Sequence, residues 1–316
     1  MRVLITGAAG FIGSHVAGAL MARGDEVVGY DNFDPFYDVA LKRENVAALE
    51  AAGPFRSIEG DIRDEDRVRA TFRAEDPDAI IHLAARAGVR PSLAEPMLYQ
   101  DVNVRGTNVL LEATKERGGR PFLFASSSSV YGANEKVPFA EDDRVDHPVS
   151  PYAATKKAGE LIAHTYHHLF GFPITCLRFF TVYGPRQRPE MAIHRFTRRI
   201  AEGRDVPLFG DGSSERDYTY VDDIVDGVLR SLDRASGYRI YNLGGSRTTR
   251  LADLVAMIGR ALGVEPKIDW QPNQPGDVPR TWADVTRSEA ELGYRPHTPI
   301  EEGIERFVAW YRARGA

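Results

Sequence analysis

Three features of this sequence predict an α/β fold, with a doubly wound parallel sheet and a smaller C-terminal lobe. Short β-branched runs alternate with stretches of helical spacing through the first half of the chain. A glycine-rich turn separates the first such run from the first helical stretch. The chain has 316 residues, 43% hydrophobic and 27% charged, which is typical of a soluble globular protein with one large domain or a domain plus a dependent lobe. Together these features indicate a Rossmann-type sheet with helices on both faces.

The expected strands are short apolar runs, and they occupy residues 3–5, 26–30, 55–59, 79–83, 122–126 and 174–179. The stretches with helical spacing lie between or after them, at 11–23, 64–74, 98–117 and 152–170. Because strand and helix alternate in this order, the sheet is expected to be parallel.

The pattern changes after Tyr183, where GPRQRP is rich in turn residues and the later elements look shorter, with Gly and Pro between them. We therefore expect a Rossmann domain at 1–183 and a substrate lobe made of 184–220 and 244–316. Segments near 221–243 are expected to return to the first sheet.

Composition excludes several classes of function. The formal net charge of −5 argues against a nucleic-acid partner. No signal peptide is expected, and no apolar stretch approaches the roughly 20 residues that cross a bilayer, so no membrane partner is expected either. The single cysteine, Cys176, is expected to be a buried apolar residue, which fits a reducing cytoplasm.

The glycine-rich turn TGAAGFIGSH places Gly7, Gly10 and Gly13 where the chain enters its first helix. Glycine permits a tight turn and leaves room for a diphosphate, which the free N–H groups of the helix N-terminus attract. Asp31 closes the second strand about 20 residues further on, where an acid binds ribose hydroxyls. Its charge would repel a 2′-phosphate, so the pattern favours NAD over NADP. The alternative is that the glycines serve only turn and packing needs and that Asp31 is a turn residue at a strand end.

The ends of two further strands contribute to the predicted NAD site. Asp61 in GDIRD has two interpretations that the sequence leaves equal, an acceptor for the adenine amino group or the cap of the next helix. Ala84 and Ala85 in HLAAR end the fourth strand, and their small side chains would let a cofactor lie close to it.

Tyr152 and Lys156 in SPYAATKK are four residues apart and share one face of an expected helix. A lysine cation beside a phenol lowers the pKa of the phenol, which then serves as a general base. Most such pairs are solvated helix faces. Here the preceding dinucleotide site, Pro151 at the helix start and the serines of FASSSSVYG favour a catalytic pair.

Nearly the whole chain resembles the extended short-chain dehydrogenase/reductase family, and within it the nucleotide-sugar epimerases. The resemblance runs through TGAAGFIGSH, NVRGTNVLLEA, SSSSVYG, SPYAATK, RFFTVYGP, RDYTYVDDIVDG and PGDVPRTWAD. It implies that Tyr152, Lys156 and Ser127 are catalytic and that Asn103 lies near the cofactor. The expected NAD-binding residues are Gly7, Gly10, Phe11, Ile12, Gly13, Asp31, Asn32, Asp61, Ile62, Leu83, Ala84, Ala85, Asn103, Tyr152 and Lys156.

Within this family the chain is most similar to UDP-glucuronate 4-epimerases, through DNFDPFYDVALKREN, HLAARAGVR and RFFTVYGPRQRPEMA. UDP-glucose 4-epimerases usually carry Asn where this chain has Thr181 and Arg where it has Gln274. Decarboxylases and 4,6-dehydratases of the family carry an acid beside the catalytic hydroxyl, whereas this chain has none beside Ser127. The resemblance therefore implies 4-epimerisation of UDP-glucuronate to UDP-galacturonate, with UDP-glucose 4-epimerase as the alternative and decarboxylase or dehydratase less favoured.

The four serines of FASSSSVYG then divide by position. Ser126 is expected to satisfy backbone groups, and Ser127 to share the path of the O4 proton. Ser128 and Ser129, with Thr181, are neutral donors that would hold the carboxylate of a uronate. Such a clamp is needed because the 4-keto intermediate is a β-keto acid that loses CO₂ readily.

The nucleotide and sugar are expected to contact further residues. Arg216 precedes the DY pair and matches the phosphate-binding Arg of the family, since its planar fork suits a diphosphate. Arg188 and Met191 are expected at the substrate, Gln274 and Asp277 at the uridine end, and Arg90 near the uronate charge. The alternative for Arg216 is a surface ion pair with Glu215 or Asp217.

Two further expectations concern metals and assembly. His164, His167 and His168 have helix-face spacing but no accompanying carboxylate or cysteine pattern, so we predict no metal. The family commonly forms homodimers through a four-helix bundle, which here would use helices near 98–117 and 152–170. A non-catalytic NAD-bound sensor on the same fold is the rival to an enzyme, and the intact Ser127, Tyr152 and Lys156 argue against it.

Overall fold

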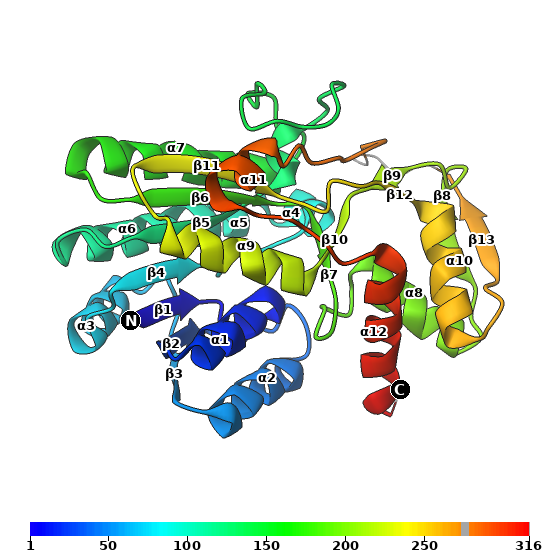
Figure 1. Ribbon diagram of the computed structural model, residues 1–316, viewed down its shortest axis with the longest axis horizontal. Helices are drawn as coiled ribbons and strands as arrows, with labels where there is room; N and C mark the ends of the chain where they lie inside the picture. Colours follow the sequence, from blue (N-terminus) through cyan, green and yellow to red (C-terminus); the bar gives the residue numbers. More distant parts are fainter. Residues whose placement is uncertain (273–277, 316) are drawn as a thin grey trace.

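A seven-stranded sheet forms the centre of the computed structural model, which describes residues 1–272 and 278–315 (Figure 1). Its strands lie in the order β11-β6-β5-β4-β1-β2-β3, and every neighbouring pair is parallel. The strands are β1 (Arg2–Thr6), β2 (Glu26–Asp31), β3 (Phe55–Glu59), β4 (Ala79–His82), β5 (Phe122–Ser127), β6 (Ile174–Phe179) and β11 (Tyr238–Leu243). The predicted doubly wound parallel sheet is confirmed.

Helices cover both faces of the sheet, because alternate residues of each strand point to opposite sides. Val3 and Ile5 of β1 belong to one apolar core, and Leu4 belongs to the other. The first core packs under α1 (Phe11–Arg23), α2 (Val39–Ala52) and α9 (Val221–Asp233). The second packs under α3 (Glu65–Glu75), α6 (Gly106–Glu116) and α7 (Pro151–Phe170), and Figure 1 shows α6 and α7 opposite α1 and α9.

Two helical regions differ from the sequence prediction. The helix expected at 98–117 consists of α5 (Pro96–Gln100), a π-helical segment (Asp101–Arg105) and α6, after a short α4 (Val89–Ala94). A π-turn adds one residue without breaking the run of helical residues, so periodicity alone does not reveal it. The patterns above also do not predict α2, in which many of the apolar residues are alanines and the buried residues are Lys42, Asn45, Val46 and Leu49.

The C-terminal part contains three two-stranded sheets and several helices. The strand pairs are β7 (Thr181–Tyr183) with β10 (Tyr218–Tyr220), β9 (Glu215–Arg216) with β12 (Thr249–Arg250), and β8 (Val206–Phe209) with β13 (Ile268–Gln271). The helices, besides α9, are α8 (Ala192–Ala201), α10 (Leu251–Leu262), α11 (Thr286–Leu292) and α12 (Ile300–Ala313).

The expectation that elements after Tyr183 are short is wrong for three of the helices, while α8 and α11 are shorter, with 10 and 7 residues. α9, α10 and α12 contain 13, 12 and 14 residues, against 13 in α1. Leu254, Ile258 and Leu262 of α10 recur at helical spacing and are buried. Glycine and proline in this part of the chain mark the ends of helices, as Gly263 does after α10. Their presence does not show that the helices are short.

A buried ion pair ties the sheet to α7. Arg178 of β6 donates to both carboxylate oxygens of Glu160 at 2.8 and 2.9 Å, and both side chains are 1% exposed. Ser126 of β5 donates to the same carboxylate at 2.7 Å. Arg178 also donates to the hydroxyl of Tyr131 at 3.0 Å. The pair therefore fixes α7 against β5 and β6, immediately beside the strand end where the serines begin.

A helix that crosses a bilayer must be both long and apolar. In residues 1–272 and 278–315, no helix is both long enough and apolar enough to do so.

Candidate active site

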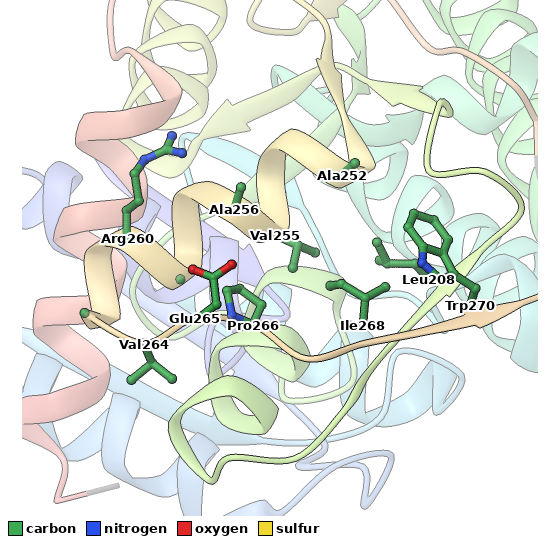
Figure 2. Close-up of a pocket in the computed structure, with 12 residues that line it drawn as sticks. Leu208, Ala252, Val255, Ala256, Arg260, Val264, Glu265, Pro266, Ile268 and Trp270 are labelled. Carbon is green, nitrogen blue, oxygen red and sulfur yellow. The ribbon is translucent and has the colours of Figure 1, made fainter.

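A cavity of about 590 Å³ lies where the carboxyl ends of β1, β4 and β5 meet. In a doubly wound sheet this edge is where ligands bind, since the loops after the strands converge there. A second cavity, of about 580 Å³, lies between α10 and β13 and is lined mainly by apolar side chains, with Arg260 and Glu265 at its edge (Figure 2). It contains none of the predicted site residues, so the first cavity is the candidate active site.

The glycine turn between β1 and α1 has no room for side chains. Gly7 has a φ of +74°, and a Cβ there would lie 2.7 Å from the backbone nitrogen of Ala84. A Cβ on Gly13 would lie 2.1 Å from the carbonyl oxygen of Gly7. Gly10 begins α1 without a side-chain cap, which leaves the first N–H groups of the helix for a ligand. This turn therefore fits the diphosphate of NAD, which supplies negative oxygens to those donors.

Gly13→Ala is expected to abolish NAD retention by the purified protein, because the added methyl group cannot fit against Gly7. Gly18→Ala in the same helix is the matched control, since its Cβ would meet only Leu49 Cδ2, at an ordinary 3.7 Å. NAD released by denaturing equal amounts of each protein measures the effect. A Gly13→Ala protein that is folded and carries as much NAD as the control would contradict the assignment of this turn.

Asp31 lies at the end of β2 and lines the cavity. Its carboxylate accepts hydrogen bonds from the backbone nitrogens of Ala9 at 3.1 Å and Phe33 at 2.9 Å. Burial raises the pKa of this carboxyl, and the two N–H donors and the charge of Lys42 oppose that effect. The group is thus held at the wall by the backbone, as a ribose-binding acid requires.

The helix-cap interpretation of Asp61 is wrong. Asp64 caps α3, since its carboxylate accepts from the backbone nitrogen of Arg67 at 3.0 Å. Asp61 instead accepts from the Arg63 side chain at 2.8 and 2.9 Å and from the Asn32 amide at 2.9 Å. Hydrogen bonds from Arg63 lower the pKa of Asp61 to about 2. Asp61 is therefore an anion on the cavity wall, with Asn32 beside it.

Asn103, predicted near the cofactor, is buried and is not among the residues that line the cavity. Its carbonyl accepts from the backbone nitrogen of Arg86 at 2.8 Å. Its amide donates to the carbonyl of Arg86 and the hydroxyl of Thr155, both at 3.0 Å. The π-turn directs this side chain to the loop after β4, so Asn103 shapes that loop and does not line the cavity.

Ser127 and Tyr152 meet across the cavity wall. β5 continues through Ser127, and α7 begins at Pro151 with Ser150 as its cap, so Tyr152 lies in the first turn. Both side chains line the cavity, and burial raises the pKa of Tyr152 while hydrogen bonding by Ser127 lowers it. Ser127 Oγ accepts a hydrogen bond from the backbone nitrogen of Ser129 at 3.1 Å. The strand end and the helix start therefore place two hydroxyls where a proton can pass between them.

Lys156 and Tyr152, the predicted catalytic pair, both line the cavity. Lys156 Nζ donates to the carbonyl of Ala125 at 2.6 Å and lies 5.9 Å from the Tyr152 ring centre. Burial lowers the pKa of Lys156 to about 7. Burial raises the pKa of Tyr152, and the groups that oppose this are Ser127 and the charge of Arg188. Desolvation weakens the lysine as a cation, which helical spacing alone does not reveal.

The remaining predicted residues divide into three groups. Those that line the same cavity are Phe11, Ile12, Ile62, Leu83, Ala84, Ala85, Arg90, Ser128, Ser129, Thr181, Arg188 and Met191. Arg216 does not: its side chain donates to the carbonyls of Glu215 at 2.9 Å and Pro279 at 3.4 Å. Gln274 and Asp277 lie outside the described residues.

The motif search did not single out several residues of the cavity wall. They are Asp34, Phe36, Tyr37, Lys42, Arg86 and Glu190. Three of them, Asp34, Phe36 and Tyr37, belong to DNFDPFYD, which begins at Asp31, the last residue of β2. Its position at the end of β2 is the signal that could have placed this loop at the cofactor end of the sheet.

The histidines of α7 lie on its surface, where the rings of His164 and His168 stack with centres 6.3 Å apart. Within the described part of the chain, His, Cys, Asp and Glu form no group of three or more that could hold a metal ion.

Known proteins match the whole chain. The "NAD dependent epimerase/dehydratase family" model matches residues 3–244. UDP-glucuronate 4-epimerase 4 of Arabidopsis thaliana is 46% identical over 98% of this chain and 75% of its own length. A probable UDP-glucuronate 4-epimerase of Rhizobium meliloti is 43% identical over 98% of this chain and 97% of its own.

Solved structures give the same result. The UDP-glucuronic acid 4-epimerase of Bacillus cereus, in complex with UDP-glucuronic acid and NAD, has a TM-score of 0.94 at 36% identity over 99% of this chain and 100% of that chain. The UDP-glucose 4-epimerase of Thermotoga maritima, with UDP-glucose, has a TM-score of 0.92 at 34% identity over the full length of both chains. The resemblance inferred from the motifs is thus confirmed, and the chain belongs to the NAD-dependent epimerase/dehydratase family, the extended short-chain dehydrogenase/reductases.

Proposed function

We propose that this protein is an NAD-dependent UDP-sugar 4-epimerase that interconverts UDP-glucuronate and UDP-galacturonate. The observation that carries the proposal is one cavity whose wall contains the glycine turn, Ser127, Tyr152 and neutral hydroxyls beyond Ser127. Relatives named UDP-glucuronate 4-epimerase, 43–46% identical over 98% of the chain, support the choice of sugar.

The protein groups move one proton. Tyr152 accepts the proton of the sugar O4 as the hydroxyl becomes a ketone, with Ser127 in the hydrogen-bonded path, and it returns the proton when the ketone is reduced. When bound, NAD⁺ would be the oxidant, accepting the hydride from C4 and returning it to the opposite face of the 4-keto sugar after the sugar has rotated. Lys156, bonded to Ala125 at the strand end, keeps the first turn of α7 against β5.

Ser128, Ser129 and Thr181 are proposed to hold the substrate carboxylate with neutral donors. The carboxylates among the described lining residues are Asp31, Asp34, Asp61 and Glu190, and none of them is adjacent to Ser127 in the sequence. Elimination of water from the sugar needs an acid and base beside the catalytic hydroxyl. The site therefore favours epimerisation over dehydration or decarboxylation.

Product analysis tests the proposal. Purified protein is incubated in parallel with UDP-glucuronate, UDP-glucose and UDP-N-acetylglucosamine, and the nucleotide sugars are separated by chromatography. UDP-glucuronate is expected to yield UDP-galacturonate without added NAD, since a cofactor that must return its hydrogen is retained. A UDP-pentose as the sole product would contradict epimerisation, and turnover of UDP-glucose alone would assign the chain to the UDP-glucose 4-epimerases.

We also propose that the protein is a cytoplasmic homodimer. Exposed apolar side chains support an interface on α7 and α5: Leu161 is 59% exposed, Leu169 63% and Met97 72%. The single cysteine is buried and unpaired, which suits a reducing compartment. The mass from sedimentation equilibrium decides between one chain and two.

A further inference from the structure

A histidine of the first helix bonds to a distant loop, the one that follows β7. His15 lies on α1, four residues after Phe11 of the cavity wall, and it is partly buried. Its Nε2 forms a hydrogen bond of 2.9 Å with the carbonyl of Pro185, 170 positions further along the chain. A carbonyl oxygen only accepts, so Nε2 carries a proton and donates it. The helix that begins at the glycine turn is therefore bonded directly to the segment after β7.

The ring of His15 is fixed in place and uncharged. It packs edge-on against Phe11, with ring centres 5.8 Å apart and planes at 86°. Burial lowers the pKa of His15, and the hydrogen bond to Pro185 opposes that effect. The charge of Arg186 lowers the same pKa and the charge of Asp222 raises it. Because the pKa lies below its ordinary value, the imidazole is neutral at neutral pH, and it donates as a neutral N–H group.

The segment that accepts this bond is tightly constrained. Arg186 has a φ of +64°, a left-handed conformation that residues other than glycine rarely adopt and that persists where the surroundings impose it. Gln187 is buried, and its side-chain amide donates to the carbonyl of Val182 at 3.1 Å. The carbonyl of Gln187 accepts from Nδ1 of His194, on α8, at 2.7 Å. Two histidines, one on α1 and one on α8, thus bond two carbonyls of the same turn.

The same segment forms part of the cavity wall. Arg188, Glu190 and Met191 line the cavity, and two residues separate Pro185 from the first of them. His15 is not among the described residues that line the cavity, so it acts on a ligand only through this segment. The helix of His15 begins at the glycine turn, which fits the NAD diphosphate. The hydrogen bond therefore joins the cofactor end of the cavity to a wall at which the UDP-sugar is expected.

We propose that His15 is a positioning residue for the substrate: through the carbonyl of Pro185 it holds residues 185–191 in the conformation that completes the cavity wall. This inference rests on the proposed function for the identity of the UDP-sugar. Without the bond, the turn relaxes from the strained geometry at Arg186, and only a fraction of the molecules keeps a complete wall. The apparent affinity for the UDP-sugar falls by that fraction. Saturating substrate selects the complete wall again, so KM changes more than kcat.

Three substitutions of His15 separate the hydrogen bond from packing. His15→Gln places an amide nitrogen at about the reach of Nε2, His15→Asn places it at about the reach of Nδ1, and His15→Leu has no donor. The Leu and Asn variants are expected to raise KM for UDP-glucuronate roughly 3- to 10-fold, the range of one hydrogen bond, with little change in kcat. The Gln variant is expected to recover most of the wild-type KM. NAD released on denaturation is expected to be equal in all three.

Binding is measured without turnover in the Tyr152→Phe background, as the dissociation constant of UDP-glucuronate by calorimetry, and the same order of variants is expected. His167→Leu is the matched control, because it removes a similar bond, from Nδ1 to the carbonyl of Phe172 at 2.9 Å. His167 lies in the last turn of α7 and is not among the residues that line the cavity, so its loss is expected to leave KM unchanged.

An unchanged KM in His15→Leu, or a Gln variant no better than the Leu variant, overturns the positioning role. A loss of NAD that accounts for the rise in KM overturns it as well, because the residue then serves the cofactor. Failure of the proposed function shows separately, as a wild type that yields no UDP-galacturonate from UDP-glucuronate. The dissociation constants of the His15 series still decide the positioning role in that case.

Discussion

Tyr152→Phe is expected to lower kcat by roughly 10²- to 10⁴-fold while the protein keeps its NAD, because the change removes the group that accepts and returns the O4 proton. The ring still fills its place at the start of α7, where it packs edge-on against Tyr99 with centres 6.2 Å apart. Stopped product assays measure the rate, and NAD released on denaturation measures retention. The combination separates loss of chemistry from loss of the fold.

Tyr99→Phe provides the control for this experiment. Its hydroxyl donates to the carbonyl of Ala87 at 2.9 Å and is absent from the proton path. Removing that single hydrogen bond is expected to change kcat by less than about tenfold, in line with the modest net contribution of one such bond. A Tyr152→Phe enzyme as active as Tyr99→Phe would favour a different base, and a wild type inactive on all three sugars would favour an NAD-bound sensor.

Glu160→Gln is expected to destabilise the protein by about 3–5 kcal/mol, because it leaves Arg178 as an uncompensated buried charge. The carboxylate accepts two hydrogen bonds from Arg178 and one from Ser126, and both members of the ion pair are 1% exposed. A carboxamide keeps the shape but offers a single acceptor oxygen and no charge. Thermal unfolding followed by circular dichroism measures the loss as a lower midpoint.

Glu302→Gln is the matched change at the surface, since Glu302 pairs with Arg306 one turn away on α12 and both side chains are nearly half exposed. Solvent screens that pair, so its removal is expected to shift the midpoint little. If the two variants unfold at the same temperature, the buried pair does not carry the stability assigned to it.

Much of the fold is encoded locally and could be predicted. The alternation of strand and helix and the glycine turn depend on neighbours within about 20 residues, so they are visible in the sequence alone. The π-turn at Asp101–Arg105 and the alanine-rich helix α2 are not predicted, because neither changes the local hydrophobic pattern in a recognisable way.

The candidate site divides similarly. The motifs predict Ser127 and Tyr152, and the structure brings both to the wall of one cavity because β5 and α7 meet at the edge of the sheet. The sequence leaves Asp61 as either an adenine acceptor or the cap of α3, and in the structure Asp64, three residues further along the chain, supplies the cap. The motif predicts Arg216 at the substrate, and in the structure its side chain donates to the backbone carbonyls of Glu215 and Pro279.

The sequence by itself determined the types of chemical group in this protein: a phosphate-binding turn, a phenol beside a hydroxyl, and a serine run without an acid. These depend on spacing along one strand or one helix. Only the tertiary structure decided which charges meet. It places Arg188, and not Lys156, as the cation that lowers the pKa of Tyr152, and it brings Phe36 against both Arg86 and Arg188. The physical reason is that desolvation and long-range packing set the strength of a charge, and neither follows from spacing in the chain.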